Sequence, residues 1–333
     1  MTKNIDSKLG FGPMSPQIIT GIIKASAKLN EPFMLICTQN QIDYDRGYVN
    51  NWNTKEYVNY VDKVKNKYKG SKIFLCRDHC GPGFKSNEID DVYKTIDNDM
   101  ENGFDMIHID FSNLGTKKNI MKETEKIIKY IIKKNKNIKI EIGTEENLGE
   151  FKNKISEVRN DLDLVKKYIL PEFFVVQTGS LVREINQIGG FNKKFIEEVH
   201  KILAENRVKL KEHNADYLNY KMIKKRKGIV DAMNIAPQLG VIQTEIVITE
   251  ALLYGINILP FLEKSYKSKA WKKWLYNNDY KNKMLCSIIA GHYNFTSNEY
   301  KDLEYKLQKH IDIEEKITNK IVELVEFYTN NFL

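Results

Sequence analysis

The sequence predicts an α/β fold, namely a (β/α)8 barrel with a helical C-terminal extension. Three observations support this prediction: eight apolar strand-like runs recur along the chain, helical segments alternate strictly with them, and no GxGxxG phosphate loop follows the first run. Alternating strands and helices build a parallel sheet through right-handed crossovers. Eight such units favour a closed barrel over an open doubly wound sheet, which more often carries that loop.

The predicted strands are short apolar runs of the kind that a parallel sheet buries on both faces. They span residues 8–13, 33–37, 72–76, 106–110, 138–143, 173–179, 208–213 and 229–236. The predicted helices lie between them and span residues 16–29, 54–68, 87–102, 117–135, 147–167, 192–206 and 217–225. A helical tail follows from about residue 242. We therefore expect one barrel over residues 1–250 and a helical extension over residues 251–333 that packs on it.

The composition, with 42% hydrophobic and 29% charged residues, is that of a globular protein with ample material for a core. The net charge of +8 comes without aromatic interleaving or a binding motif, so we expect no nucleic-acid partner. No apolar run approaches the ~20 residues of a membrane span. The N-terminal MTKNIDSK has no signal-peptide core, and the four cysteines complete neither a zinc cluster nor a disulfide framework. A cytoplasmic location without a membrane partner is the expectation.

Polar residues gather at the carboxyl ends of the predicted strands, where a (β/α)8 barrel carries its chemistry. They are Asn40, Asp78, His79, His108, Asp110, Glu141, Glu145, Glu146, Gln177, Gly179, His213, Asn214, Asp216, Asn234 and Gln238. Three of the six histidines in the chain are among them. Because barrel interiors are otherwise filled by Val, Ile and Leu, this placement indicates an active site.

The segment KIFLCRDHCGPG at 72–83 is the most informative of these ends, because an apolar strand stops at Asp78-His79 and a Gly-Pro-Gly break follows. A carboxylate beside an imidazole can supply a proton carrier and a metal ligand together. The alternative is a strand terminus with two ordinary polar residues. His213 and Glu141 could complete a two-nitrogen, one-oxygen zinc site with His79.

Two further features leave alternatives open. His108 and Asp110 share one strand face, so they could form a hydrogen bond inside the barrel or take part in catalysis. Lys209 and Lys211 share strand parity with His213, which makes a Schiff-base lysine conceivable, although lysine is abundant throughout the chain.

Seven strings together resemble a known family. They are ICTQNQIDYDRGY (36–48), DHCGPG (78–83), IHIDFS (107–112), EIGTEE (141–146), VVQTG (175–179), HNADY (213–217) and IAPQL (235–239). In order and spacing they resemble the Z-type subunit family of tagatose-1,6-bisphosphate aldolase (the GatZ and KbaZ proteins), over residues ~8–250. That family is similar to the class II, zinc-dependent aldolases, whose fold is the (β/α)8 barrel.

The resemblance implies a metal-dependent aldolase in which one Zn²⁺ per subunit polarises the ketose carbonyl, so that no lysine imine is needed. It implies that Asp78 exchanges the proton of the aldehyde oxygen, and that Glu145 or Glu146 moves the proton at the nucleophilic carbon. It implies His79, Glu141 and His213 as metal ligands.

The substrate contacts follow from the same resemblance, and the phosphate is expected at backbone N–H groups after the seventh and eighth strands. The implied contacts are Asn40, Gln177, Gly179, Asn214, Asp216, Asn234 and Gln238. One departure is that class II aldolases place a further metal histidine where this chain has Gln177, which could serve as a weak ligand.

The sequence therefore predicts a class II-like aldolase that adds dihydroxyacetone phosphate reversibly to an aldehyde, with a tagatose-1,6-bisphosphate-like product. The alternatives are a non-catalytic stabilising subunit of a heteromeric aldolase and a metal-dependent sugar epimerase that runs a retro-aldol step. The expected partners are a sugar phosphate and either further copies of the chain or a class II aldolase subunit. Arg46 and Arg77 are candidates for a distal phosphate, or for ordinary ion pairs.

Overall fold

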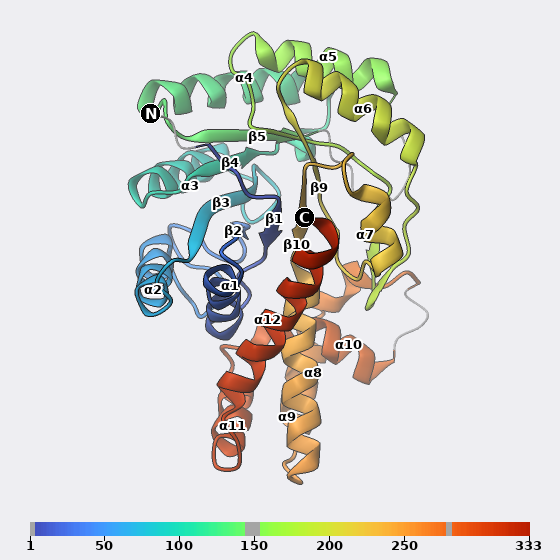
Figure 1. Cartoon of the computed structure of the whole chain (residues 1–333). Coiled ribbons are helices and arrows are strands. Elements are labelled where there is room, and N and C mark those ends of the chain that lie inside the picture. Colours follow the sequence, from blue (N-terminus) through green and yellow to red (C-terminus); the bar gives the residue numbers. More distant parts are fainter. Residues whose placement is uncertain (1–3, 144–153, 278–281) are drawn as a thin grey trace.

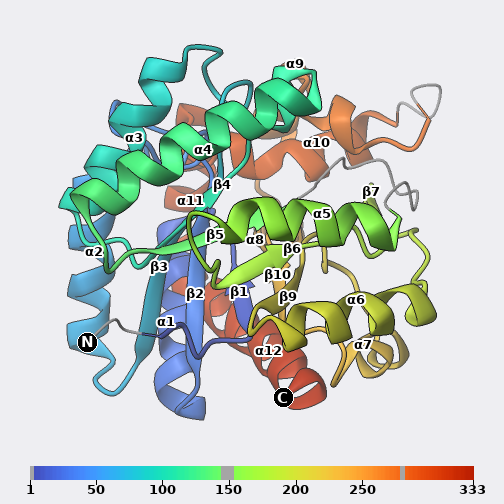
Figure 2. The ribbon, with the colours of Figure 1, turned by 90° about the horizontal axis from the view of Figure 1, so that it is seen from above.

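A closed barrel of eight parallel strands forms the centre of the computed structural model, which describes residues 4–143, 154–277 and 282–333. The strands follow one another in the order β1-β2-β3-β4-β5-β6-β9-β10, and β10 pairs with β1 to close the barrel (Figures 1 and 2). Their bounds are β1 Leu9–Phe11, β2 Pro32–Cys37, β3 Lys72–Cys80, β4 Met106–Ile109, β5 Lys139–Gly143, β6 Phe173–Val175, β9 Lys209–Glu212 and β10 Ala232–Ile235. The predicted (β/α)8 barrel is confirmed.

Amphipathic helices connect the barrel strands and cover the outside of the barrel (Figure 2). Their bounds are α1 Pro16–Leu29, α2 Thr54–Lys67, α3 Ile89–Glu101, α4 Lys117–Lys134, α5 Ile155–Lys166, α6 Lys193–Glu205 and α7 Tyr220–Arg226, with the 3-10 turn η1 Ser112–Leu114 before α4. Side-chain caps fix several of their starts. Ser15 caps α1, and Asn53 forms a capping box with Glu56 at α2. The first residues of the helix predicted over 147–167 lie outside the described ranges.

Two strand predictions differ from the structure. β3 continues to Cys80 instead of ending at Cys76, because it still pairs with β4 after a register shift. The strand predicted over 173–179 ends at Val175, and a small antiparallel hairpin, β7 (Val182–Arg183) with β8 (Asn186–Gln187), follows it.

An apolar layer fills the part of the barrel interior toward the amino ends of the strands. It consists of Ile5, Met34, Ile36, Phe74, Cys76, Met106, Phe173 and Ala232, all of them buried. On β2 and β3 they stand at every second position, Met34 with Ile36 and Phe74 with Cys76, as inward-facing side chains must. A larger apolar cluster lies between the outside of the barrel and the surrounding helices. The next inward positions, toward the carboxyl ends of the strands, are therefore the ones available for polar chemistry.

The C-terminal part is helical, as predicted, and the final helix packs on the barrel. Its elements are α8 Pro237–Leu253, α9 Leu259–Lys267, η2 Ala270–Trp274, α10 Lys283–Ala290, η3 Gly291–Asn294, α11 Asn298–Leu307 and α12 Ile313–Phe332. α12 packs against α1 and α7, and a Cβ added at Gly21 of α1 would lie 2.7 Å from the Cβ of Ile321. In Figure 1, α8, α9 and α11 extend away from α4, α5 and α6.

None of the helices in the described part of the chain combines the length and the apolar character needed to cross a membrane.

Candidate active site and metal centre

The strand alternation places ionisable side chains directly above the apolar layer of the barrel. On β3 the inward residues Phe74 and Cys76 are followed by Asp78. On β4, Met106 is followed in the same way by His108, whose register partner on β5 is Glu141. All three polar side chains are buried. On β3 and β4 the inward face thus changes from apolar to ionisable side chains over two residues, from Cys76 to Asp78 and from Met106 to His108.

A β-bulge brings His79 to the same site as Asp78. Arg77 pairs with Ile107 and Cys80 with Ile109, so two residues of β3 lie opposite the single residue His108 of β4. His79 adopts a φ of 47°, in the left-handed region that a residue with a side chain rarely occupies. Bulges of this kind redirect side chains near active sites. Here the bulge turns two consecutive residues toward the barrel interior, where a regular strand would present one.

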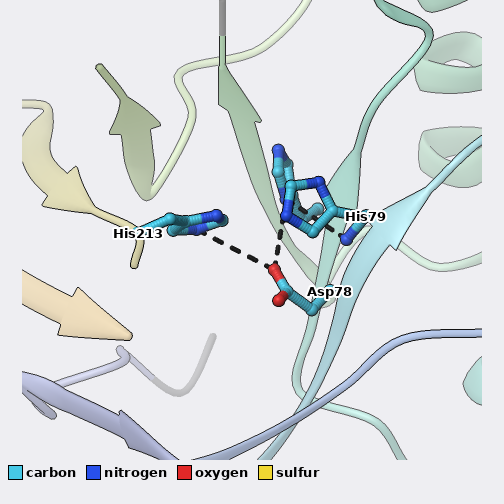
Figure 3. A group of neighbouring side chains, drawn as sticks. Asp78, His79 and His213 are labelled. Carbon is cyan, nitrogen blue, oxygen red and sulfur yellow. Dashed lines mark hydrogen bonds and ion pairs between the residues drawn. The ribbon is translucent and has the colours of Figure 1, made fainter. Parts of the chain in front are cut away.

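Asp78, His79, His108 and His213 form a compact cluster at the mouth of the barrel (Figure 3). One ligand atom from each lies within 4.8 Å of those of the other three. Asp78 Oδ1 lies 3.4 Å from His108 Nδ1 and 3.8 Å from His213 Nε2. The imidazole rings meet one another with centroids 4.9 to 5.2 Å apart. β3, β4 and the end of β9 each contribute to this cluster.

Asp110 orients the His79 ring. Its Oδ2 lies 2.7 Å from His79 Nδ1, and the ring stacks on Phe84 with centroids 5.0 Å apart. A carboxylate that accepts the Nδ1 proton selects the tautomer whose lone pair is on Nε2, as second-layer carboxylates do for metal-binding histidines. Of the two roles considered for the His108–Asp110 pair, a mutual hydrogen bond or a part in catalysis, the hydrogen bond is not formed, since Asp110 pairs with His79 instead.

Glu141 lies beneath the histidines and joins them to Lys211. Its Oε1 accepts a hydrogen bond from His213 Nε2 at 2.9 Å and lies 3.7 Å from His108 Nδ1. Its Oε2 lies 2.6 Å from Lys211 Nζ. Burial raises the pKa of Glu141, but the Lys211 ammonium and the His213 hydrogen bond outweigh it and lower the pKa to about 2. Glu141 is therefore a carboxylate at neutral pH.

Asp78 is also ionised. Burial raises the pKa of its carboxyl, but the imidazoles of His79, His213 and His108 hold that pKa well below its ordinary value. A buried carboxylate surrounded by three imidazoles is therefore held in its charged form, in which it attracts a cation.

The donor set fits a zinc ion. A tetrahedral ion with bonds of about 2.1 Å places its ligand atoms roughly 3.4 Å apart. Glu141 Oε1 lies 2.9 Å from His213 Nε2 and 3.7 Å from His108 Nδ1, distances on either side of that value, and the ligand atoms of His79, His108 and His213 lie within 4.8 Å of one another. Imidazole and carboxylate are also the ligands that catalytic zinc prefers.

Asn234 faces this cluster from β10 with an unused amide. Its side chain is only 4% exposed, and neither Oδ1 nor Nδ2 has a hydrogen-bond partner among the described residues. Gly10 on the neighbouring strand makes room for it, since a Cβ there would lie 2.4 Å from Asn234 Oδ1. Buried amides are normally satisfied, so this one is a candidate for contact with a bound molecule.

Asp216 and Gln238 support loops rather than line an open site. Asp216 Oδ1 accepts hydrogen bonds from the backbone N–H groups of Ala236 and Gln238, at 3.0 and 2.9 Å. Burial raises the pKa of Asp216 to about 7. Gln238 Oε1 accepts from the Tyr217 N–H at 2.8 Å and from the Tyr328 hydroxyl at 2.9 Å. These contacts fix the loop after β9 against the start of α8.

The remaining predicted contacts lie around the mouth. Asn214 has a φ of 57° and accepts a hydrogen bond from Gln187 through its carbonyl, at 2.8 Å. Gln177 is buried just beyond β6, and Gly179 has a φ of 98°. Asn40 is exposed, and its amide donates to the carbonyl of Phe84. Glu145 and Glu146 lie outside the described residues.

The two arginines considered for a distal phosphate form ion pairs. Arg77 is fully buried and donates two hydrogen bonds of 2.7 Å to Asp99 on α3. Arg46 pairs with Glu56 at the surface, with N–O distance 3.0 Å. Neither guanidinium belongs to the histidine cluster.

Sequence reasoning did not foresee the position of two residues, His108 as a member of the cluster and Lys211 as the partner of Glu141. Both positions carried a signal. His108 is two residues after the apolar Met106 and Lys211 is two residues before His213, so each shares the inward face of its strand.

Comparison with known protein families gives one match. Residues 10–168, just under half of the 333-residue chain, match the family model of class-II fructose-bisphosphate aldolase. This range contains Asp78, His79, His108 and Glu141. The comparison with curated proteins found no match.

Solved structures of low sequence identity share the fold. A "probable tagatose 6 phosphate kinase" from Sinorhizobium meliloti 1021 is 16% identical, with a TM-score of 0.74 over 97% of this chain and 92% of that one. Fructose-bisphosphate aldolase from Campylobacter jejuni is 13% identical, with a TM-score of 0.62 over 98% and 91%. The fructuronate-tagaturonate epimerase UxaE from Cohnella laeviribosi is 11% identical, with a TM-score of 0.55 over 99% and 80%.

The protein is thus a (β/α)8 barrel that is similar to class-II fructose-bisphosphate aldolase over residues 10–168. This match confirms the class II aldolase-like resemblance that the sequence strings indicated.

Proposed function

We propose that the protein is a metal-dependent ketose-phosphate aldolase that adds dihydroxyacetone phosphate reversibly to an aldehyde, with a tagatose-1,6-bisphosphate-like product. The observation that carries this proposal is the cluster of three histidines around Asp78. His79, His108 and His213 would hold one Zn²⁺ per subunit together with one oxygen of Glu141, and His108 of β4 would take the place of the histidine that Gln177 replaces. A bound zinc would supply the Lewis acid that polarises the substrate carbonyl.

The ionised Asp78 is placed to exchange the proton of the aldehyde oxygen. In the cleavage direction it takes the proton from the hydroxyl on the carbon that becomes the aldehyde, and in synthesis it returns that proton. The resemblance assigns the proton at the nucleophilic carbon to Glu145 or Glu146.

The Asn234 amide is the proposed contact for the oxygen on which negative charge develops, because its buried donor has no other partner in the described part of the chain. Backbone N–H groups near Gly179, Asn214 and Asn234 would bind the phosphate. Asn40 and Gln177 are further proposed contacts. Asp216 and Gln238 would act indirectly, by holding the loops that carry these groups.

A sugar epimerase is the second candidate. A retro-aldol step followed by re-addition to the other face of the aldehyde would invert one carbinol centre with the same Lewis acid and the same proton carrier. The similarity in fold to an epimerase along 99% of this chain favours keeping this candidate. A purely stabilising subunit is less consistent with the site, since burying Asp78 and Glu141 among imidazoles costs solvation free energy that structure alone does not require.

The test compares the zinc-loaded protein with its Asp78→Asn variant in the cleavage of ketose 1,6-bisphosphates. We expect the variant to lose at least about 100-fold in turnover, the size of a lost general acid–base contribution. It should keep one zinc per chain, measured by elemental analysis. Product stereochemistry separates the two candidates, because an epimerase would release a ketose that differs at one centre and little free triose phosphate. Unchanged turnover in the variant would contradict the role of Asp78.

A further inference from the structure

Lys211 carries a buried ammonium directly below the proposed metal centre. Its side chain on β9 is 1% exposed, and its Nζ lies 2.6 Å from Glu141 Oε2. The other Glu141 oxygen accepts the hydrogen bond from His213 Nε2 at 2.9 Å. The chain of contacts therefore runs from the ammonium through one carboxylate to an imidazole of the cluster.

The surroundings of Lys211 are otherwise apolar. Its Nζ lies 3.9 Å from the Met34 sulfur and 5.0 Å from the centroid of the Phe173 ring. Among the described residues Glu141 is the carboxylate that pairs with it. A cation in such a place is costly unless its partner is held in good geometry, so the two charges fix each other.

We propose that Lys211 is a positioning residue that holds Glu141 so that only Oε1 faces the metal centre. This inference rests on the proposed metal-dependent function and adds a control on the coordination of the ion. With Oε2 engaged by Lys211, Glu141 cannot chelate the ion through both oxygens. Coordination positions then stay open for the oxygens of a hydroxyketone.

Charge supports the same role. Asp78 and Glu141 bring two negative charges to one small buried site, and a divalent ion attracted by both would be held tightly and surrounded by protein ligands. The Lys211 charge offsets one of them. The site keeps its affinity for the ion but does not fill the positions that substrate needs, which is the condition for a catalytic rather than a structural metal site.

The same geometry disfavours an imine-forming role for Lys211. An imine requires a neutral amine that a carbonyl carbon can approach. The Lys211 Nζ is paired with a carboxylate and covered by Met34 and Phe173.

The test measures metal binding and metal coordination, neither of which depends on turnover. Lys211→Met is compared with Lys209→Met, a matched control on the same strand whose ammonium pairs with Glu172 and is partly exposed. Zinc affinity is measured by competition with a chromogenic chelator. Coordination number is read from the visible d–d absorbance of the Co²⁺-loaded protein, which weakens as four-coordinate cobalt gains ligands.

We expect Lys211→Met to bind zinc about tenfold or more tightly and its cobalt absorbance to fall, because Glu141 becomes free to chelate. Lys209→Met should match the wild type in both measurements. Glu141→Gln/Lys211→Met should regain the wild-type cobalt absorbance and lose the tighter binding. If Lys211→Met does not fold, Lys211→Gln, which can still donate to Glu141, should shift both readouts in the same direction by a smaller amount.

Unchanged zinc affinity and an unchanged cobalt spectrum in the folded Lys211 variants would overturn this inference, while the proposed aldolase would stand if the wild type binds zinc and is active. A wild-type protein that binds neither zinc nor cobalt would overturn both.

Discussion

The position of His108 follows from the alternation of side chains along a β-strand, in which every second residue faces the barrel interior. His108 follows Met106 on the inner face of β4 and reaches the same cluster as His213, more than a hundred residues away in the chain. The strand pattern places each histidine at the mouth of the barrel. The pattern does not predict which of these histidines come into contact, because contact depends on the register between neighbouring strands.

Replacing His108 tests whether it is a metal ligand. We expect His108→Ala to weaken zinc binding by more than about 100-fold, beyond the loss usually caused by removing an outer-layer partner. Competition with a chelator measures the change. His200→Ala is the control, because His200 lies on the outer helix α6 beside Asp231, at 3.4 Å. Equal zinc affinity in the two variants would remove His108 from the ligand set.

The site residues differ in how far the sequence could predict them. Asp78 and Asn234 were predictable, because each continues an apolar inward face beyond the core layer. The partner of Asp110 and the pairing of Lys211 with Glu141 were not, since both depend on side-chain contacts between strands. Lysine is so frequent in this chain that one buried lysine gives no compositional signal.

At the scale of elements, strand β3 carries Asp78 and His79 of the site, and helix α3 anchors that strand through Asp99. Arg77 directly precedes Asp78 on β3, and its side chain extends to α3. There it donates two hydrogen bonds of 2.7 Å to the Asp99 carboxylate. It also donates to the carbonyl of Ile42 in the loop after β2, at 2.5 Å. One guanidinium thus joins β3, α3 and that loop immediately beside the bulge.

Removing this anchor should be costly. We expect Arg77→Met to lower the free energy of unfolding by about 3–5 kcal/mol, because it leaves Asp99 buried without its partner. Arg46→Met is the matched control, since Arg46 forms an exposed pair with Glu56 and such pairs contribute about 0–1 kcal/mol. Urea denaturation followed by circular dichroism measures both. Similar losses in the two variants would contradict the anchoring role of Arg77.

The order of strands and helices was predictable from alternation, but two local features were not. The bulge at Asp78–His79 depends on the left-handed backbone of His79, a conformation for which a histidine gives no sequence signal. The β7–β8 hairpin follows β6 because Thr178 and Ser180 donate to Glu212 instead of extending the strand.

At the scale of the whole molecule, the C-terminal helices contact two loops at the carboxyl end of the barrel. The Tyr328 hydroxyl of α12 donates to the carbonyl of Ala215, at 2.9 Å, in the loop after β9. His292 of η3 is buried against Gly240 of α8, and its ring lies near Tyr48 in the loop after β2, with centroids 6.1 Å apart. The C-terminal region therefore supports two of the loops that surround the site.

His292 makes this assembly sensitive to acid. Burial lowers the pKa of its imidazole from 6.5 to about 3, and neither ring nitrogen has a hydrogen-bond partner among the described residues. The unfolded chain binds the proton first, so the stability that neutral His292 contributes is present above about pH 6.5 and is lost as pH falls toward 3. We expect the free energy of unfolding to fall by up to about 1.4 kcal/mol per pH unit from this group in that window.

Denaturation of His292→Phe between pH 7 and pH 4 measures this contribution. In the variant, the slope of the free energy of unfolding against pH should fall by the contribution of about one bound proton. His310→Phe is the control, because His310 is exposed and stacks on Tyr254 at the surface. A pH dependence of His292→Phe identical to that of the wild type would show that acid acts elsewhere.

The most direct test of the central claim is whether the zinc-loaded protein activates dihydroxyacetone phosphate. In deuterated water we expect stereospecific exchange of one C–H proton of this substrate, followed by NMR, and loss of the exchange when zinc is removed by a chelator. Exchange requires no knowledge of the aldehyde partner. A fully zinc-loaded protein that exchanges no proton of dihydroxyacetone phosphate would contradict the account of this site as an aldolase centre.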